Sequence, residues 1–256
     1  MNILTTPESW TQLRNTLKDP SIGCVPTMGN LHEGHLALMR RARAENDLCV
    51  VSIFVNPTQF NSQIDFDRYP KTFEQDCALL ESVGVDYLLA PHNEALYPDG
   101  FEIQVSETLE SQILEGAFRP GYFTGMLTIV LKLLNLIRPN RAYFGEKDFQ
   151  QLRLVQKMAR ALFLPIEIIP CPTIRAEKGL ALSSRNGRLS PNGQVHAANL
   201  AATLRSAKTP EAAFQQLEQL GFKPEYVEEC WGRRLTAAWL EDVRLIDNID
   251  AGEIKC

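Results

Sequence analysis

The chain has 256 residues, of which 45% are hydrophobic and 22% are charged, and its formal net charge is −5. This composition is typical of a globular enzyme or binding protein and excludes a chain without a packed core. The acidic balance argues against a broad nucleic-acid-binding surface, so we expect no nucleic-acid partner.

The sequence has the features of neither a secreted nor a membrane-spanning protein. The opening "MNILTTPESWTQL" lacks a basic segment followed by an apolar core, which predicts a cytoplasmic protein without a secretory signal. The most apolar stretch, "GMLTIVLKLLNLI", is interrupted by Lys132 and Asn135 and is shorter than the roughly 20 residues that cross a bilayer. We therefore expect no membrane span. The six cysteines form no CxxC pair, which predicts reduced, mostly buried thiols.

Short β-branched runs alternate with segments of helical periodicity, a pattern that indicates βαβ units and a parallel sheet of the α/β class. The predicted strands cover 21–25, 48–55, 86–91 and 165–175, and "RAYFGEKD" (141–148) is predicted as a strand followed by a turn. The predicted helices cover 34–44, 72–84, 124–137 and 149–163. Thr72 and Gln75 have the spacing of a capping box. Pro139 ends the third helix, and the prolines of 165–175 predict a strand at the sheet edge.

The character of the chain changes after Ile174. A polar loop, "AEKGLALSSRNGRLS", leads into an Ala-rich helix from Pro191 and then to "RRLTAAWLEDVRLID". We expect a first domain over residues 1–173 and a smaller second domain over residues 174–256.

The first candidate site is "VPTMGNLHEGHLALMRRA", where a predicted strand gives way to a helix. His32 and His35 share one face of the first helical turn, and Gly29 and Gly34 let the backbone approach a ligand closely. A helix N-terminus at the carboxyl end of a parallel strand suits an anion, so the motif predicts a phosphate-binding cradle.

Two other interpretations of these histidines stay open. A zinc site would use the spacing HExxH, whereas "HEGH" places its histidines three apart, and only His92 and His196 remain as further imidazole ligands. Alternatively, both histidines stabilise a turn without binding anything.

Three further loops at predicted strand ends carry polar side chains that suit binding or charge stabilisation. "FVNPTQF" offers the amides of Asn56 and Gln59, or else ordinary Asn-Pro turn chemistry. "FGEKDFQQL" places Lys147 before a helix, for phosphate or for a surface ion pair. "LALSSRNGRL" contains hydroxyls and a guanidinium that bind phosphate, unless the loop is simply solvated. Four such loops together predict an ATP-using transferase.

In this order and spacing, the motifs resemble the pantoate–β-alanine ligase family (pantothenate synthetases) of the HxGH nucleotidyltransferases. "YPKTFEQD", "EGAFRPGYFTGMLTIVLKLLNLIRP" and "RLIDNI" are also similar to their family counterparts. The chain differs from the usual family pattern in "RPGYF" for RPGHF, which places Tyr122 where a histidine is common, and in "MGNLH" for MGALH. The segment 222–234 is shorter than usual.

The resemblance implies a Rossmann-like parallel sheet flanked by helices, with an α+β C-terminal domain that acts as a lid. It implies that pantoate attacks the α-phosphorus of ATP to give pantoyl adenylate and pyrophosphate, and that β-alanine then displaces AMP to form pantothenate. It also implies ATP as a substrate with Mg²⁺, and a homodimer. The lid would exclude water from the adenylate.

By the same resemblance, His32, His35 and Lys147 are the catalytic residues, Gln59 and Gln151 bind pantoate beside Met28, and Gln59 also binds β-alanine. Asp76 would ligate Mg²⁺ or support its ligands, and Asn56, Tyr69 and Arg119 are further site residues. The implied ATP-binding residues are Met28, Gly29, Asn30, Leu31, His32, Glu33, Gly34, His35, Gly145, Glu146, Lys147, Asp148, Ile174, Leu182, Ser183, Ser184 and Arg185.

Two other functions are compatible with the phosphate cradle. A nucleotidyltransferase acting on a phosphorylated acceptor would share His32 and His35, but it would need basic residues where this chain has the amides of Gln59 and Gln151. A nucleotide-sensing module would keep the cradle without the chemistry, and Tyr122 and the short C-terminal region are the features that suggest it.

Overall fold

The structure is a computed structural model that describes residues 1–61, 63–67 and 69–253. It divides into two compact units. Unit 1 comprises Met1–Gly145 and Gln150–Cys171, and unit 2 comprises Glu146–Phe149 and Pro172–Cys256. The connection between two strands of unit 1 therefore contributes four residues to the other unit.

Unit 1 is built on a six-stranded parallel sheet, as the alternation of strands and helices predicts. In spatial order its strands are β1 (Asn2–Leu4), β4 (Tyr87–Leu89), β3 (Leu48–Ile53), β2 (Ile22–Thr27), β5 (Arg141–Gly145) and β6 (Glu167–Cys171). The proline-containing strand β6 lies at the edge, which confirms the prediction for that segment. Strand β1 was not predicted, because three residues are too few to show an alternating pattern.

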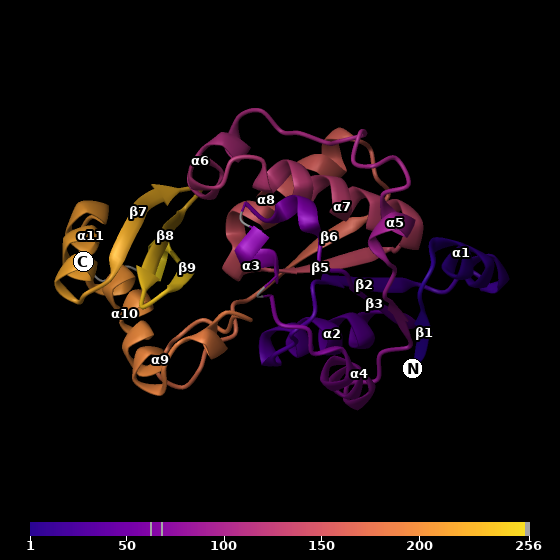
Figure 1. The fold of residues 1–256 in the computed structure, drawn as a ribbon, viewed down its shortest axis with the longest axis horizontal. Helices are drawn as coiled ribbons and strands as arrows, with labels where there is room; N and C mark the ends of the chain where they lie inside the picture. Colours follow the sequence, from indigo (N-terminus) through magenta and orange to yellow (C-terminus); the bar gives the residue numbers. More distant parts are fainter. Residues whose placement is uncertain (62, 68, 254–256) are drawn as a thin grey trace. The chain divides into compact units, whose positions relative to one another are not determined.

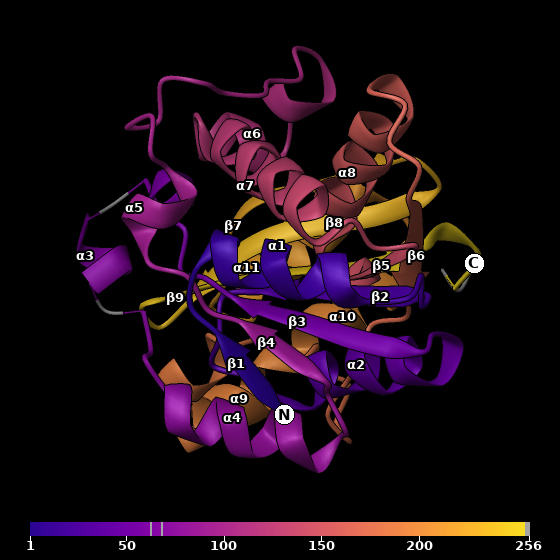
Figure 2. The ribbon, with the colours of Figure 1, turned by 90° about the vertical axis from the view of Figure 1, so that its right-hand side faces the viewer.

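Helices cover both faces of this sheet (Figures 1 and 2). Helices α2 (Glu33–Glu45) and α4 (Phe73–Ser82) lie on one face, and α1 (Pro7–Thr16), α7 (Tyr122–Ile137) and α8 (Phe149–Ala161) lie on the other. Short helical segments in the connections are η1 (Pro57–Gln59), α3 (Gln63–Asp67), α5 (Asn93–Leu96), η2 (Glu110–Gln112) and α6 (Glu115–Phe118). The core beneath α2 and α4 includes Val25, Met39, Val51 and Leu80, all fully buried.

Two helix boundaries show how local chemistry sets the fold. Helix α7 ends where Arg138 adopts a left-handed conformation, with φ 51°, directly before Pro139, as predicted. Helix α4 does begin after Thr72, but the predicted capping box is wrong, because no side chain caps its N-terminus. The Thr72 hydroxyl instead donates to the Asp76 carboxylate at 3.1 Å, since that acceptor lies one helical turn away.

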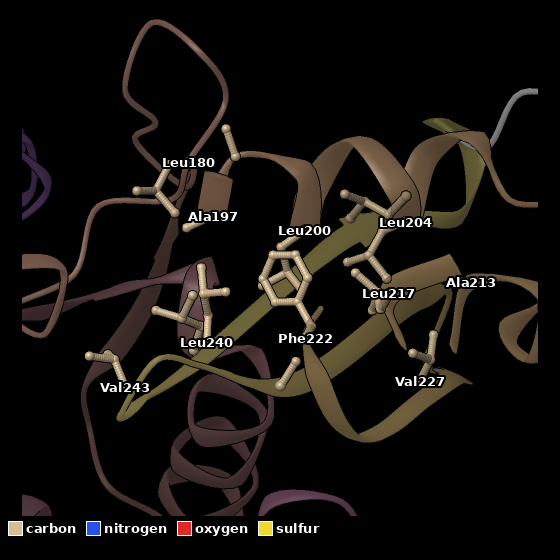
Figure 3. Packing of buried hydrophobic residues seen from close by; sticks show 14 of the residues in the cluster. Leu180, Ala197, Leu200, Leu204, Ala213, Leu217, Phe222, Val227, Leu240 and Val243 are labelled. Atoms are coloured by element: carbon tan, nitrogen blue, oxygen red, sulfur yellow. The ribbon is translucent and has the colours of Figure 1, made fainter. Parts of the chain in front are cut away.

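Unit 2 contains an antiparallel sheet of β7 (Lys223–Cys230), β8 (Arg233–Leu240) and β9 (Val243–Asp250). The Ala-rich segment forms two helices that meet at Ala198, namely α9 (Pro191–Ala197) and α10 (Asn199–Ser206), and α11 (Pro210–Gln219) follows. Leu200, Leu204, Leu217 and Phe222 pack between these helices and the sheet (Figure 3). Unit 2 therefore has a hydrophobic core of its own.

The thiols agree with the prediction as far as the described residues extend. Their five cysteines are free, and Cys24, Cys49 and Cys171 are buried. Burial raises the pKa of the Cys49 thiol to about 12, so this thiol stays protonated and unreactive. Cys256 lies outside the described residues. Among the described helices, none has the length and apolar character needed to span a bilayer.

Candidate active site

The predicted site residues follow the carboxyl ends of four adjacent strands of the parallel sheet. The loop with His32 and His35 follows β2, and the loop with Asn56 and Gln59 follows β3. Lys147 follows β5 within the short helix η3 (Glu146–Asp148), and the serine loop follows β6. The first two loops belong to unit 1, and the last two belong to unit 2.

The two histidines cap the N-terminus of α2 reciprocally. The Nδ1 atom of His32 accepts a hydrogen bond from the Gly34 N–H at 3.1 Å, and the Nδ1 atom of His35 accepts one from the His32 N–H at 3.3 Å. Their ring centroids lie 4.1 Å apart. A neutral imidazole whose Nδ1 accepts a hydrogen bond carries its own proton on Nε2. Each ring can therefore present an Nε2–H donor beside a helix N-terminus.

Asp76 fixes the backbone that precedes these histidines. One of its oxygens accepts from the Leu31 N–H at 2.8 Å, and the other accepts from the Asn30 N–H at 2.9 Å and from the Thr72 hydroxyl at 3.1 Å. The Asp76 side chain is buried, with 2% of the residue exposed. These contacts make Asp76 the anchor of the loop, a role that the sequence did not predict.

Glycine is required at the start of this loop. Gly29 has φ +79°, and a Cβ atom there would lie 3.0 Å from the Asp76 carboxylate and 3.2 Å from Ile53 Cγ2. The next residue, Asn30, is also left-handed, with φ 49°, a conformation that asparagine tolerates better than most residues. The loop can therefore turn sharply just after the carboxyl end of β2. Glu33 forms a surface ion pair with Arg40.

Gln59 is held in one orientation by a buried network. Its side-chain oxygen accepts from Asn56 Nδ2 at 3.0 Å, and its Nε2 points at the Met28 sulfur at 3.1 Å. The Asn56 oxygen in turn accepts from the hydroxyls of Tyr97 at 2.8 Å and Thr58 at 3.0 Å. The structure thus brings Met28 and Gln59 into contact, and that they share a ligand stays a prediction. Asn56 supports Gln59 from behind.

A second chain of contacts links Gln59 to Gln151 within unit 1. Arg119 donates to the Gln59 carbonyl at 3.1 Å, and its guanidinium carbon lies 3.7 Å from the centre of the Tyr122 ring. The Tyr122 hydroxyl donates to the Gln151 side-chain oxygen at 3.3 Å. That oxygen is therefore engaged within the protein, and the Nε2–H₂ group is the donor part of the Gln151 amide. Tyr69 is buried and packs edge-on against Phe60 at 5.6 Å.

Lys147 lies in a turn of unit 2 whose backbone carbonyls accept hydrogen bonds from a side chain of the same unit. The Asn248 side chain on β9 donates to the carbonyls of Glu146 and Lys147, each at 2.9 Å. The Lys147 ammonium is 3.8 Å from the Asp148 carboxylate, and 16% of the lysine side chain is exposed. Gly145 is the last residue of β5 and leads into this turn.

The serine loop is closed by a small hairpin. The Leu182 N–H donates to the Ile174 carbonyl at 3.0 Å, and Arg175 and Ala181 form an isolated antiparallel bridge. The Ser183 hydroxyl then accepts from the Arg185 N–H at 3.3 Å. Ser183, Ser184 and Arg185 therefore sit at the mouth of a hairpin that fixes where they emerge.

The structure thus assembles two partial sites. In unit 1 it brings together the histidine loop with Asp76, and the residues Met28, Asn56, Gln59, Arg119 and Gln151 with Tyr122. In unit 2 it gives fixed positions to Lys147 and to the serine loop. That all of these groups meet at one phosphate stays a prediction.

The sequence matches the protein-family model described as pantoate-beta-alanine ligase over residues 2–250. The chain belongs to the pantoate–β-alanine ligase family. A pantothenate synthetase of Legionella pneumophila is 48% identical over 249 residues, which are 97% of this chain and 99% of that protein. One of Bdellovibrio bacteriovorus is 49% identical over 229 residues, covering 90% and 91% of the two chains.

Solved structures agree with this family. The pantoate–β-alanine ligase of Francisella tularensis, crystallised with beta-gamma ATP and β-alanine, superposes with a TM-score of 0.94 at 41% identity, covering 98% of each chain. The pantothenate synthetase of Thermus thermophilus gives a TM-score of 0.90 at 41% identity, covering 98% and 99% of the two chains. The family's Rossmann-like sheet and small C-terminal domain are therefore those of this chain. As a pantoate–β-alanine ligase, the chain condenses pantoate with β-alanine through a pantoyl adenylate, at the expense of ATP.

Several residues that shape the site were not predicted from the sequence. Tyr97 and Thr58 orient Asn56, and Asp247 and Asn248 hold segments of unit 2. The only available signal was the family-like "RLIDNI" run, which contains the last two. The similarity of this run to the family pattern did not show which residues Asp247 and Asn248 contact.

Proposed function

We propose that the residues of both partial sites bind ATP phosphates during pantoyl-adenylate formation. The observation that supports this most directly is the histidine pair, whose Nδ1 atoms are both occupied by backbone N–H groups. Two Nε2–H donors at a helix N-terminus suit phosphate oxygens. The same geometry disfavours zinc, since the two Nδ1 atoms are engaged and no group of three or more His, Cys, Asp or Glu ligands gathers in the described part of the chain.

In the first step, a carboxylate oxygen of pantoate forms a bond to the α-phosphorus, and the bond from that phosphorus to the bridging oxygen of pyrophosphate breaks. The amides of Gln59 and Gln151 would hold pantoate, with Met28 against its dimethyl group. His32 and His35 would donate to the phosphates, and His35 would assist the departing pyrophosphate. Fixed donors of this kind stabilise charge without reorganising during the reaction.

On the unit 2 side, the Lys147 ammonium would stabilise the negative charge that grows on the α-phosphoryl group. Ser183, Ser184 and Arg185 would hold the outer phosphates. In the second step the neutral amine of β-alanine attacks the acyl carbon, AMP leaves with the electron pair, and the amine loses its proton to solvent. Gln59 would also bind β-alanine, the ligand with which the Francisella tularensis relative was crystallised.

Mg²⁺ would enter with the triphosphate. Both oxygens of Asp76 already accept protein N–H groups, and the described residues offer no multi-carboxylate cage. Mg²⁺ in nucleotide sites is commonly held by substrate phosphates and water with few protein ligands, and bound there it would neutralise phosphate charge. We also propose that the enzyme is a cytoplasmic homodimer, on the basis of its family resemblance.

Pantoate-dependent exchange of labelled pyrophosphate into ATP, without β-alanine, tests this assignment. Lys147→Ala and His35→Ala should each slow exchange by about 10²-fold to 10³-fold while ATP still binds, because each removes charge stabilisation from the transition state. Lys18→Ala, which removes an exposed lysine on the surface of unit 1, is the matched control.

Exchange at the wild-type rate in both site variants would remove them from the mechanism. An absence of exchange in the wild-type protein, with ATP bound, would favour a nucleotide-sensing module. Exchange that needs a phosphorylated acceptor in place of pantoate would favour the other class of nucleotidyltransferase.

A further inference from the structure

Two adjacent polar residues of β9, Asp247 and Asn248, are buried without a part in the proposed chemistry. Only 4% of Asp247 and 2% of Asn248 is exposed. A carboxylate and an amide at such depth are costly unless their hydrogen bonds are satisfied. Their partners therefore show what the burial achieves.

Asp247 holds the segment that leads to the serine loop. Its two oxygens accept from the two terminal nitrogens of Arg175 at 2.7 and 2.8 Å, a bidentate pair in which 2% of the aspartate side chain is exposed. Arg175 also donates to the carbonyls of Gly179 and Asn248, each at 3.0 Å. Arg175 bridges to Ala181 across the hairpin. The ion pair thus ties β9 to the hairpin from which Ser183 emerges.

Asn248 holds the turn that carries Lys147. Its Nδ2 donates to the carbonyls of Glu146 and Lys147, and its oxygen accepts from Arg233 at 2.9 Å. Arg233 also binds the Glu146 carboxylate at 2.8 Å, and its guanidinium lies 4.5 Å from the centre of the Phe149 ring. Glu146, Lys147 and Phe149 are therefore all contacted by side chains of β8 or β9.

We propose that Asp247 and Asn248 form a positioning pair, which sets the Lys147 turn and the Ser183–Arg185 loop in register for one triphosphate. The inference rests on the proposed function of those two segments and deepens it. Adjacent residues on one strand are a rigid connection, so a shift of either segment is resisted by the other. Stabilisation of a phosphoryl transition state depends on such preorganisation, and a displacement of about 1 Å can cost about 10²-fold in rate.

The chemistry requires an amide at position 248. An aspartate has the same shape but no N–H donor, so it would place a carboxylate against two carbonyl oxygens. Asn248→Asp should therefore release the Lys147 turn while keeping the contact to Arg233. We expect adenylate formation in a single turnover to fall by about 10²-fold, with the Kd of ATP changed less than about threefold.

A double-mutant cycle separates positioning from general loss of structure. If Asn248 acts through Lys147, Asn248→Asp should have almost no further effect on exchange in the Lys147→Ala background. A purely structural role predicts that the two losses multiply, and that result would overturn the inference. Amide hydrogen exchange of the peptide containing 146–149 should also rise selectively in Asn248→Asp.

Asp247→Asn should slow exchange in the same way, because it weakens the pairing with Arg175. Asp242→Asn, the same change at an exposed residue of the β8–β9 turn, is its control and should leave exchange unaltered. If Asn248→Asp does not fold, Arg233→Gln removes the Glu146 contact at a partly exposed position and should slow exchange by a smaller factor. Wild-type exchange in the folded variants would refute the positioning role.

The outcomes also distinguish this inference from the function on which it rests. If Lys147→Ala exchanges normally, the proposed role of the lysine fails. If Lys147→Ala is impaired and Asn248→Asp is normal, only the positioning role fails.

Discussion

The anchoring of the histidine loop by Asp76 leads to a quantitative prediction for Asp76→Asn. The carboxylate accepts from the N–H groups of Asn30 and Leu31 and from the Thr72 hydroxyl. In the asparagine variant, one of the two oxygens becomes an N–H₂ group. Thr72 can rotate its hydroxyl to accept, but in either orientation of the amide one backbone N–H faces another donor.

The cost follows from the buried position of these groups. A hydrogen bond to a charged acceptor contributes about 1.5–3 kcal/mol, and a buried donor left without an acceptor costs about 1–3 kcal/mol. These two values partly describe the same loss and cannot simply be added. We therefore expect the free energy of unfolding to fall by about 2–4 kcal/mol, less than their full sum. For a chain of this size the melting temperature should fall by about 2–4 °C per kcal/mol.

Thermal unfolding and pyrophosphate exchange should be measured together, over a range of Mg²⁺ concentrations. The anchoring role predicts lower stability and slower exchange that added Mg²⁺ does not restore. Glu74→Gln, which alters an exposed acid in the first turn of the same helix, is the control. Unchanged stability, with exchange restored by excess Mg²⁺, would refute the anchoring role and make Asp76 a metal ligand.

Two further predictions concern single hydrogen-bonding groups in unit 1. Tyr122→Phe should raise the KM for pantoate by about fivefold, the equivalent of one neutral hydrogen bond, without changing the KM for ATP, because Gln151 loses its orienting donor while the ring under Arg119 remains; an unchanged pantoate KM would argue against this role. Burial raises the pKa of Glu107, but hydrogen bonds from Lys157 and backbone N–H groups outweigh it and lower the pKa from 4.5 to about 2. A carboxyl with a lowered folded-state pKa stabilises the protein above its unfolded pKa and loses that contribution as the pH falls towards 2. Glu107→Gln should therefore lower the melting temperature at pH 7, with a difference from wild type that shrinks below pH 4.5; a constant difference down to pH 2 would contradict the assignment.

Most of the main sheet could be predicted because its signals are local. The run "LCVVSIFV" is apolar except for Ser52, and a parallel strand buried on both faces typically has such a pattern. The positions of the candidate loops followed, since the carboxyl ends of parallel strands lie at one edge. The local pattern left Lys147 either a phosphate-binding or a surface ion-pair role, and the resemblance favoured the first.

The supporting contacts were not predictable, because they join distant parts of the chain. Asp76 lies 45 residues after Leu31, and Asn248 lies 101 residues after Lys147. No periodicity or turn rule connects such pairs. Thr72 shows the same limit locally, since its sequence spacing suited a capping box, whereas its hydroxyl donates to the Asp76 carboxylate and caps no backbone N–H.

Residues Glu146–Phe149 follow β5 of the main sheet but belong to unit 2, and this limits how the protein can be divided into fragments. A fragment that starts at residue 172 would contain the small sheet and its helices but not Glu146–Phe149. Its Asn248 Nδ2 group and its Arg233 guanidinium would lose the contacts that they make to Glu146 and Lys147 in the whole chain. An excised C-terminal fragment is therefore a poor substitute for this part of the enzyme. A better fragment would include residues 146–149, either fused to it or added as a separate peptide.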